Sequence, residues 1–360
     1  MITKYTIARD DSIYQAWPDV ALTPSGRLVC VYSECAAHTD RSFTRIVAVQ
    51  SDDRGRCWSQ PVPVTGVLHR DAEYAPFWNC ARITTLRDGR MCVLADRIAG
   101  PNEGDAPGGE RSNWLIFSAD NGETWSESAP TPAVGIVPDR LLECATGPAP
   151  GRWIVTCHRV DGAKWEQRSW FSDNRGETWH GPIVVADFKG LKLCEGSLFE
   201  LGGGEICCLM RENSLAGLDG FKAISRDGGQ TWTAPSPIAL PGCHRPTGGK
   251  LRDGRILVTY RFMQGGAGWT QNLFGALTDD ASCLTEDQSQ TRTRIFPIDY
   301  DRSPNPDGGY SGWVQFDDGE VYIVNYIKDD APKAQIRGYS LNLDQLIVAP
   351  SEHEESHNVK

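Results

Sequence analysis

The chain has 360 residues, of which 40% are hydrophobic and 23% charged, with 37 glycines and 22 prolines, a composition typical of a soluble globular protein with many turns. Its 47 acidic and 36 basic residues give a net charge of −11 without any basic run, which argues against nucleic acid or an anionic membrane as a partner. Because no stretch of about 18 apolar residues is present, we expect no membrane-spanning segment.

The N-terminus, from Met1 to Asp10, lacks the apolar core of a signal peptide. The twelve cysteines form no CxxC pair and no His/Cys cluster with the spacing of a zinc site, and most of them lie in strand-like runs. We therefore expect buried, reduced thiols, a cytoplasmic protein, no metal site and no cofactor. A secreted protein whose signal has been removed would show the same pattern.

Six similar units follow one another along the chain, and each has an apolar run, a turn centred on glycine and a second strand-like run. The turn glycines are Gly26, Gly89, Gly151, Gly204, Gly254 and Gly319. Short β-branched runs bounded by Gly and Asp indicate strands, and no segment shows sustained helical periodicity. The pattern predicts an all-β protein, a six-bladed β-propeller that forms one domain over residues 1–350. We expect a strand near Lys4–Ala8 to close the last blade, and residues 351–360 to form a polar, disordered tail.

Four of the units also carry an octad of the pattern Ser-x-Asp-x-Gly-x-Thr-Trp, with Cys57 in the Thr position of the first copy and Asn174 in the Asp position of the third. The copies end at Trp58, Trp125, Trp179 and Trp232, at intervals of 67, 54 and 53 residues, which is typical of a repeat architecture. The Asp side chain can accept hydrogen bonds from backbone N–H groups downstream, the Gly permits positive φ, and the Trp can bury its ring against a neighbouring unit. We interpret the octads as structural hairpins, and we expect a degenerate copy at Thr278–Thr285.

The first strand of each propeller blade lines a central channel, and ligands bind at one mouth of that channel. Counting nine residues back from each turn glycine gives the positions expected to face it: Trp17, Cys80, Leu142, Glu195, Arg245 and Tyr310. Two residues further along, the count gives Asp19 and Arg82 in the first two blades, and Glu143 lies one residue from the third position. Charged and aromatic side chains that converge on one channel indicate binding or catalysis rather than packing alone.

The octad resembles the Asp box of the sialidase (neuraminidase) superfamily, and the blade pattern extends this resemblance over nearly the whole chain. The resemblance implies an exo-acting glycoside hydrolase that removes a terminal sugar from a glycan. The segment from Glu195 to Leu201, with Arg211 on the next strand, resembles the one that carries the family's catalytic glutamate and one arginine of its carboxylate-binding triad. The segment Gly309-Tyr310-Ser311 resembles the one that carries its tyrosine nucleophile.

A tyrosine hydroxyl, with a free pKa of about 10, needs a neighbouring carboxylate to take its proton before it can act as a nucleophile. We therefore expect Glu195 to pair with Tyr310 in a retaining mechanism. The resemblance places the acid/base at Asp40, on a loop over the channel mouth, where a solvated structural aspartate is the alternative. Substrate binding is expected from Arg211, Arg245, Asp19, Arg82, His38 and Glu143.

The chain departs from the family pattern at two arginines of the triad. Ala16 replaces the first, and Gly265–Gly275 contains no arginine for the third, so we expect a sugar other than plain sialic acid, with Arg245, Arg261 or Arg82 as possible substitutes. Two alternatives stay open. One is a glycosidase or lyase for another sugar that uses Glu143, His158 or His244, with Glu143 and Glu195 as a carboxylate pair like that of exo-arabinanases. The other is a non-catalytic carbohydrate- or protein-binding propeller.

Overall fold

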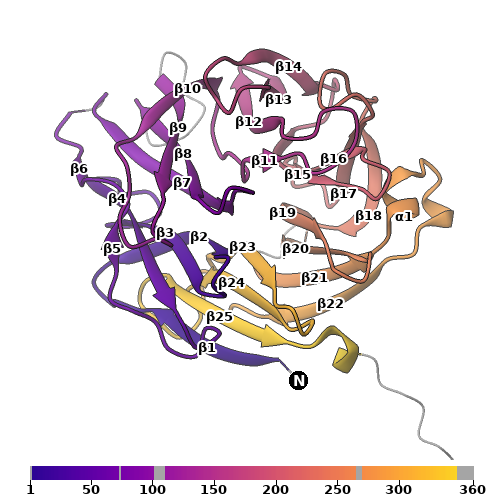
Figure 1. Ribbon diagram of the computed structural model, residues 1–360. Coiled ribbons are helices and arrows are strands. Elements are labelled where there is room, and N and C mark those ends of the chain that lie inside the picture. The colour runs from indigo at the N-terminus through magenta and orange to yellow at the C-terminus, as the bar shows by residue number, and fades with distance from the viewer. Residues whose placement is uncertain (1, 73, 101–109, 265–269, 347–360) are drawn as a thin grey trace, which may run out of the picture.

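Six antiparallel β-sheets stand side by side around a common centre, like the blades of a propeller (Figure 1). The computed structural model describes residues 2–72, 74–100, 110–264 and 270–346. This arrangement confirms the prediction of an all-β, six-bladed propeller. The predicted tail, residues 351–360, lies outside the described residues.

The first three blades run in chain order, each with its innermost strand first. Blade one contains β2 (Tyr14–Leu22), β3 (Leu28–Cys35), β4 (Phe43–Ser51) and β5 (Val62–Pro63), with β6 (Leu68–His69) also paired to β4. Blade two contains β7 (Pro76–Thr85), β8 (Met91–Ala99), β9 (Glu110–Ser118) and β10 (Ala129–Val134). Blade three contains β11 (Leu142–Glu143), β12 (Trp153–Asp161), β13 (Lys164–Ser172) and β14 (His180–Ala186).

The remaining blades complete the ring. Blade four contains β15 (Leu193–Glu200), β16 (Ile206–Glu212), β17 (Asp219–Ser225) and β18 (Ser236–Pro241). Blade five contains β19 (Cys243–Lys250), β20 (Ile256–Phe262), β21 (Asn272–Thr278) and β22 (Arg294–Asp299). Blade six contains β23 (Gly308–Gln315), β24 (Val321–Ile327), β25 (Gln335–Leu341) and, outermost, β1 (Thr3–Ala8). Within the described residues, three short helices lie outside the sheets: α1 (Asp280–Leu284), η1 (Gln288–Gln290) and η2 (Leu343–Leu346).

The N-terminal strand closes the ring, as the sequence predicted. β1 pairs antiparallel with β25, with Thr3 opposite Ser340 and Tyr5 opposite Gly338, and Figure 1 shows β1 beside β25 in blade six. A closed ring leaves only short outer edge strands exposed, which limits edge-to-edge pairing with other chains.

The octads form the hairpins that join the third and fourth strands of their blades, and each hydrogen-bonds as predicted. In the first, Asp53 Oδ1 accepts a hydrogen bond of 2.8 Å from the backbone N–H of Cys57, and Gly55 has a φ of +82°. The Tyr322 hydroxyl of blade six donates to the Gly55 carbonyl at 2.8 Å, and the rings of Tyr322 and Trp58 lie 6.1 Å apart. The hairpin therefore fastens its own blade to the preceding one. Where a degenerate fifth copy was expected, the chain instead forms α1, capped by the side chain of Asp279.

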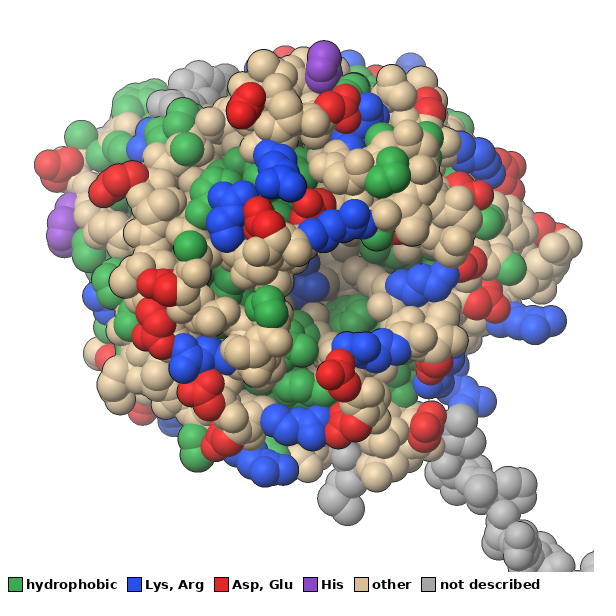
Figure 2. All heavy atoms as spheres, viewed as in Figure 1, with side chains coloured by type: hydrophobic (Ala, Val, Ile, Leu, Met, Phe, Trp, Pro, Cys, Tyr) green, Lys and Arg blue, Asp and Glu red, His purple; other side chains and the backbone are tan. Residues whose placement is uncertain are grey.

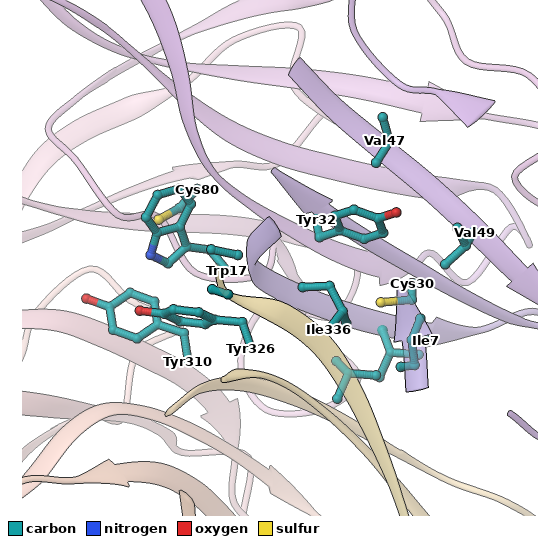
Figure 3. Packing of buried hydrophobic residues seen from close by; sticks show 14 of the residues in the cluster. Ile7, Trp17, Cys30, Tyr32, Val47, Val49, Cys80, Tyr310, Tyr326 and Ile336 are labelled. Carbon is teal, nitrogen blue, oxygen red and sulfur yellow. The ribbon is translucent and has the colours of Figure 1, made fainter. Parts of the chain in front are cut away.

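Apolar side chains fill the wedges between the blades. One cluster, drawn in Figure 3, extends from Ile7 and Val49 at the outer strands of blades six and one to Trp17, Tyr310 and Tyr326 beside the channel. All twelve cysteines are free thiols and only Cys57 is exposed, as expected for small buried hydrophobic residues. No helix in the described segments is long and apolar enough to cross a membrane.

The innermost strands share a β-bulge, in which two residues face one residue of the next strand. The paired residues are Trp17–Pro18, Asn79–Cys80, Glu195–Gly196, Arg245–Pro246 and Gly309–Tyr310. In four of these five pairs, the first residue has a φ between +48° and +94°. This backbone conformation is costly for residues other than glycine and is found most often at functional sites. Counting nine residues back from the turn glycine therefore identifies a residue of the bulge in five of the six blades.

Blade three is the exception to that count, because its turn is longer. The N–H of Gly151 bonds to the carbonyl of Cys144, seven residues back, whereas the N–H of Gly26 in blade one bonds to Thr23, three residues back. Leu142 consequently lies beyond the bulge position, in β11, opposite Ile154. The equivalent position, with a φ of +51°, is held by Val137, and its neighbour Ile136 forms a bridge to His158.

Candidate active site

The structure brings the predicted tyrosine and glutamate into direct contact across 115 residues of sequence. Tyr310 comes from the bulge of β23 and Glu195 from the bulge of β15, and the two side chains are only 8% and 5% exposed. The Tyr310 hydroxyl donates a short hydrogen bond to Glu195 Oε1, and Arg211 Nη1 donates to the same oxygen at 2.9 Å. A β-bulge changes the direction of a side chain relative to a regular strand, and the two bulges direct Tyr310 and Glu195 towards each other.

The protonation states of this pair follow from burial and charge. Burial by itself would raise the pKa of Glu195, but the positive charge of Arg211 and the hydrogen bond from Tyr310 outweigh it and lower the pKa to about 2. Burial, followed by the negative charge of Glu195, raises the pKa of Tyr310 well above its usual value. At neutral pH a carboxylate therefore accepts a hydrogen bond from a protonated phenol.

Two further arginines lie against the Tyr310 ring. The guanidinium carbon of Arg261 is 4.5 Å from the ring centroid and that of Arg245 is 5.8 Å away. Arg245 is completely buried, and its Nη2 donates to the carbonyl of Pro138 at 2.8 Å. Arg261 donates to the carbonyl of Gly308 and, at 2.8 Å, to the hydroxyl of Tyr326. Together with Arg211, three arginines lie around the Tyr310–Glu195 pair, and Arg245 Nη1 also lies 3.6 Å from Asp139 Oδ1.

Two buried histidines border the same site. His158 Nδ1 accepts a hydrogen bond of 3.4 Å from the backbone N–H of Glu195, and burial lowers the pKa of His158 to about 4. Burial, helped by Arg211, also lowers the pKa of His244 to about 2. Both imidazoles are therefore neutral at neutral pH, which removes them as proton donors in the resting protein.

Buried polar atoms without a hydrogen-bond partner gather at this site. Within the described residues they include Glu195 Oε2, Arg211 Nε, Arg245 Nε and Nη1, and His244 Nδ1. A buried polar group left without a partner costs about 1–3 kcal/mol, so a cluster of them in one place indicates a ligand that supplies the missing partners. The Nε donor of Arg245, which has no hydrogen-bond partner in the described residues, suits an anionic group on that ligand.

Towards the channel mouth, a second polar group joins blades one and six. His38 Nδ1 lies 2.9 Å from Asp307 Oδ2, and the Tyr14 hydroxyl donates to the same oxygen at 2.5 Å. The Tyr326 hydroxyl donates to Asp307 Oδ1 at 3.1 Å, which links this group to Arg261. Sequence reasoning selected His38 but missed Asp307, although it lies only three residues before Tyr310.

Two other predicted residues, Asp40 and Glu143, lie elsewhere in the ring. Asp40 is exposed, and its Oδ1 accepts a 2.9 Å hydrogen bond from the backbone N–H of Ser42 within its own loop. Glu143 Oε2 accepts a 2.7 Å hydrogen bond from the backbone N–H of Arg87, in the glycine-centred turn of blade two. The structure therefore places Glu143 at the turn end of the blades and does not bring it to Glu195.

Asp19 and Arg82 are paired with each other inside the channel. Arg82 Nε lies 3.3 Å from Asp19 Oδ2, and Arg140 donates to both oxygens of the same carboxylate, at 2.9 and 2.5 Å. A Cβ atom added to Gly312 would lie 1.8 Å from Asp19 Oδ1, so the carboxylate fills the space that this glycine leaves. The contacts of Asp19 and Arg82 join residues of different blades. Figure 2 shows the ring hollowed at its centre on the face viewed, with basic and acidic side chains around the hollow.

The six antiparallel blades, four of which carry an Asp-box hairpin, define the fold class of sialidase-like β-propellers. Within this class, the chain belongs to the family of the BNR repeat-like domain, whose model matches residues 26–323.

Solved structures of several propellers resemble the chain over nearly its whole length. One is a protein of unknown function from Dyadobacter fermentans, with a TM-score of 0.74, 20% identity, and 95% of this chain and 99% of that chain covered. The intramolecular trans-sialidase from Ruminococcus gnavus, in complex with oseltamivir carboxylate, has a TM-score of 0.70 and 15% identity, covering 94% and 96%. The α-L-arabinanase from Penicillium chrysogenum, in complex with arabinobiose, has a TM-score of 0.62 and 13% identity, covering 95% and 98%. At these identities the likeness shows the fold.

Proposed function

We propose that the protein is a retaining, exo-acting glycoside hydrolase that removes a terminal sugar from a glycan. The observation that carries this proposal is the hydrogen bond from Tyr310 to the ionised Glu195, buried among three arginines. A tyrosine beside a carboxylate is a nucleophile with its own base, and the partners missing around them are those that a bound sugar would supply.

In the first step, the Tyr310 oxygen attacks the anomeric carbon while its proton passes to Glu195 Oε1. The low pKa of Glu195 opposes this transfer in the resting protein, and Arg211 is the largest favourable cause of that low pKa. A bound anion would offset the charge of the arginines and so raise the affinity of Glu195 for the proton. Substrate binding and activation of the nucleophile are thereby coupled. A residue of the loop 36–42, for which the sequence suggests Asp40, protonates the leaving oxygen and later activates water.

The arginines favour a sugar that carries a carboxylate. Arg211, Arg245 and Arg261 bring three positive charges to the site. Arg211 pairs with Glu195, Arg245 Nη1 lies 3.6 Å from Asp139 Oδ1, and Arg261 is linked through Tyr326 to Asp307, while Arg245 Nε has no hydrogen-bond partner in the described residues. Guanidinium groups bind carboxylates through paired hydrogen bonds, so a keto-acid sugar fits this set better than a neutral one. Because Ala16 stands where the sialidase pattern has an arginine, the anion would be bound from blades four and five, which supports a sugar other than plain sialic acid.

The test is a hydrolysis screen with aryl glycosides of sialic acid, related keto-acid sugars, rhamnose and arabinose. We expect one anionic glycoside to be cleaved with retention, seen by NMR of the first-formed anomer. Tyr310→Phe and Glu195→Gln should each lower kcat by at least about 100-fold. Tyr32→Phe is the matched control, because the Tyr32 ring is fully buried and its hydroxyl has no hydrogen-bond partner in the described part of the chain.

Two outcomes would contradict the proposal. Cleavage that survives Tyr310→Phe would remove the tyrosine nucleophile and return the chemistry to the carboxylate or histidine alternatives. A wild-type protein that binds a glycan array but cleaves no member of the panel would be a carbohydrate-binding propeller.

A further inference from the structure

His38 stands at the mouth of the channel with one ring nitrogen held and the other free. Its side chain is 49% exposed, whereas that of Asp307, which holds it, is 18% exposed. His38 Nδ1 is 2.9 Å from Asp307 Oδ2, and none of the described residues hydrogen-bonds Nε2. An imidazole oriented through Nδ1–H by a carboxylate exchanges its other proton at Nε2, which is the arrangement of a histidine acid/base.

The carboxylate that holds His38 is ionised. Burial by itself would raise the pKa of Asp307, but hydrogen bonds from His38 and Tyr14 outweigh it and lower the pKa. Because an ionised carboxylate can only accept hydrogen bonds, the proton between Asp307 Oδ2 and His38 lies on Nδ1. Asp307 therefore fixes the tautomer and supports a positive charge on the imidazole.

A row of aromatic rings connects His38 to the proposed nucleophile. His38 meets the Trp17 ring edge-on at 5.4 Å, the Trp17 and Tyr326 rings are 6.1 Å apart, and the Tyr326 and Tyr310 rings are 6.0 Å apart. Figure 3 shows Trp17 beside Tyr310 and Tyr326, with the two hydroxyls directed to the same side. His38 and Tyr310 thus stand at the two ends of one row of packed rings, which joins the loop of blade one to the bulge of blade six.

We propose that His38, positioned by Asp307, is the acid/base of this site in place of Asp40, an inference that rests on the proposed function. In the first step the Nε2 proton of the His38 imidazolium passes to the leaving oxygen as its bond to the anomeric carbon breaks and the Tyr310 oxygen bonds to that carbon. In the second step neutral His38 takes a proton from water, whose oxygen displaces Tyr310, and Glu195 returns its proton to the Tyr310 oxygen. The net change is the addition of one water molecule.

The charged and titratable groups around His38 come from three directions. Asp307 and Tyr14 contact the imidazole directly, and Tyr326 hydrogen-bonds the other oxygen of Asp307. The guanidinium carbon of Arg41 lies 4.1 Å from the centroid of the Trp17 ring. Lys333 Nζ donates to the carbonyl of Ala36 at 2.7 Å. Asp40, in the same loop, keeps its own hydrogen bonds to Ser42.

The experiment compares two glycosides of the sugar that the screen identifies, one with an activated 4-nitrophenyl leaving group and one with a methyl leaving group. His38→Asn should lower kcat/KM for the methyl glycoside by about 10²–10⁴-fold, because its leaving oxygen needs the proton, and for the 4-nitrophenyl glycoside by less than about tenfold. Azide, which needs no base, should restore turnover of the 4-nitrophenyl glycoside and give a glycosyl azide. Asp307→Asn should cause a smaller loss with the same selectivity for the methyl glycoside, because the imidazole loses the carboxylate that holds its orientation.

His180→Asn is the matched control. His180 is exposed and directly follows the Asp-box hairpin of blade three, whereas His38 lies in the loop between β3 and β4 of blade one. Asp40→Asn should leave the ratio of the two substrates unchanged. If Asp40→Asn rather than His38→Asn produces the selective loss, or if His38→Asn affects neither substrate, the inference is overturned while the proposed function stands. If the wild-type protein cleaves neither glycoside, or if Tyr310→Phe retains activity, the proposed function fails and this inference fails with it.

Discussion

Glu195 combines three features that single residues seldom share: a left-handed backbone, almost complete burial and a negative charge. Its φ is +51° and its side chain is 5% exposed. A charge in such a place persists only if neighbours stabilise it, and Arg211 and Tyr310 supply hydrogen bonds to one of its oxygens. Its other oxygen, Oε2, has no partner in the described part of the chain. Strain, burial and an unpaired atom at one residue favour a functional role over a structural one.

The low pKa of Glu195 predicts a specific acid dependence of stability. Its pKa falls from 4.5 to about 2 on folding, so its ionised form stabilises the folded state above pH 4.5 and this stabilisation is lost as the pH falls towards 2. The full effect is on the order of 3 kcal/mol. Urea unfolding from pH 6 to 2 should show the free energy of the wild type falling relative to Glu195→Gln across that window. A difference between the two proteins that does not change with pH would contradict the lowered pKa.

At the scale of elements, each Asp-box hairpin has a local part and a part that depends on the next blade. The hydrogen bonds of Asp53 lie within the octad, whereas the contact of Gly55 with Tyr322 joins blades one and six. The glycine is needed for two reasons, its φ of +82° and the absence of a Cβ, which would lie 2.2 Å from the Tyr322 ring.

A pair of glycine substitutions separates these two reasons. Gly254 also has a positive φ, +89°, but a Cβ there would meet no described atom within 4 Å. Gly254→Ala should lower the free energy of unfolding by about 1–2 kcal/mol, from backbone strain alone. Gly55→Ala should cost about 1–3 kcal/mol more, because the Tyr322 ring must move. Urea unfolding of both variants is the measurement, and equal losses would show that the hairpin does not depend on its contact with blade six.

For the whole molecule, the channel is held by one buried network of charges. Arg82 of blade two contacts Asp19 of blade one, the Thr247 hydroxyl of blade five and the Ser311 carbonyl of blade six. Arg140, from the segment before β11, completes the network at Asp19. Burial lowers the pKa of Arg82 to about 10, although the negative charge of Asp19 opposes this shift. Without that carboxylate, the positive charge of the buried Arg82 would destabilise the folded protein. We expected Asp19 and Arg82 to bind substrate; the structure shows contacts that join the blades, and the binding role stays a prediction.

Substitution of Asp19 tests this structural role. Asp19→Asn leaves Arg82 and Arg140 without their main counter-charge in a buried place, so it should lower the free energy of unfolding by about 3–5 kcal/mol. Asp52→Asn is the control, because Asp52 pairs with Arg27 at an exposed site and its loss should cost less than about 1 kcal/mol. Thermal and urea unfolding would show the difference. A stable Asp19→Asn protein with weakened substrate binding would support the binding role instead.

Most of the fold and the centre of the site could be predicted because they depend on local or repeated patterns. The turn glycines and the octads report backbone conformations that only a few residue types adopt, so they mark each hairpin without knowledge of its neighbours. The same turns located Glu195, Arg245 and Tyr310 at the channel. Leu142 was misplaced because one long turn in blade three broke the count.

The sequence by itself therefore determined the number of blades, the closure by β1 and the pairing of Glu195 with Tyr310, because turn chemistry and hydrophobic period act over a few residues and recur six times. Only the tertiary structure decided which charges meet. It paired Asp19 with Arg82, kept Glu143 at the turn end, and set Asp307 against His38 across 269 residues of sequence. Distances between side chains on different blades depend on the curvature of the closed ring and on bulges that redirect single residues, and no local pattern in the chain encodes them.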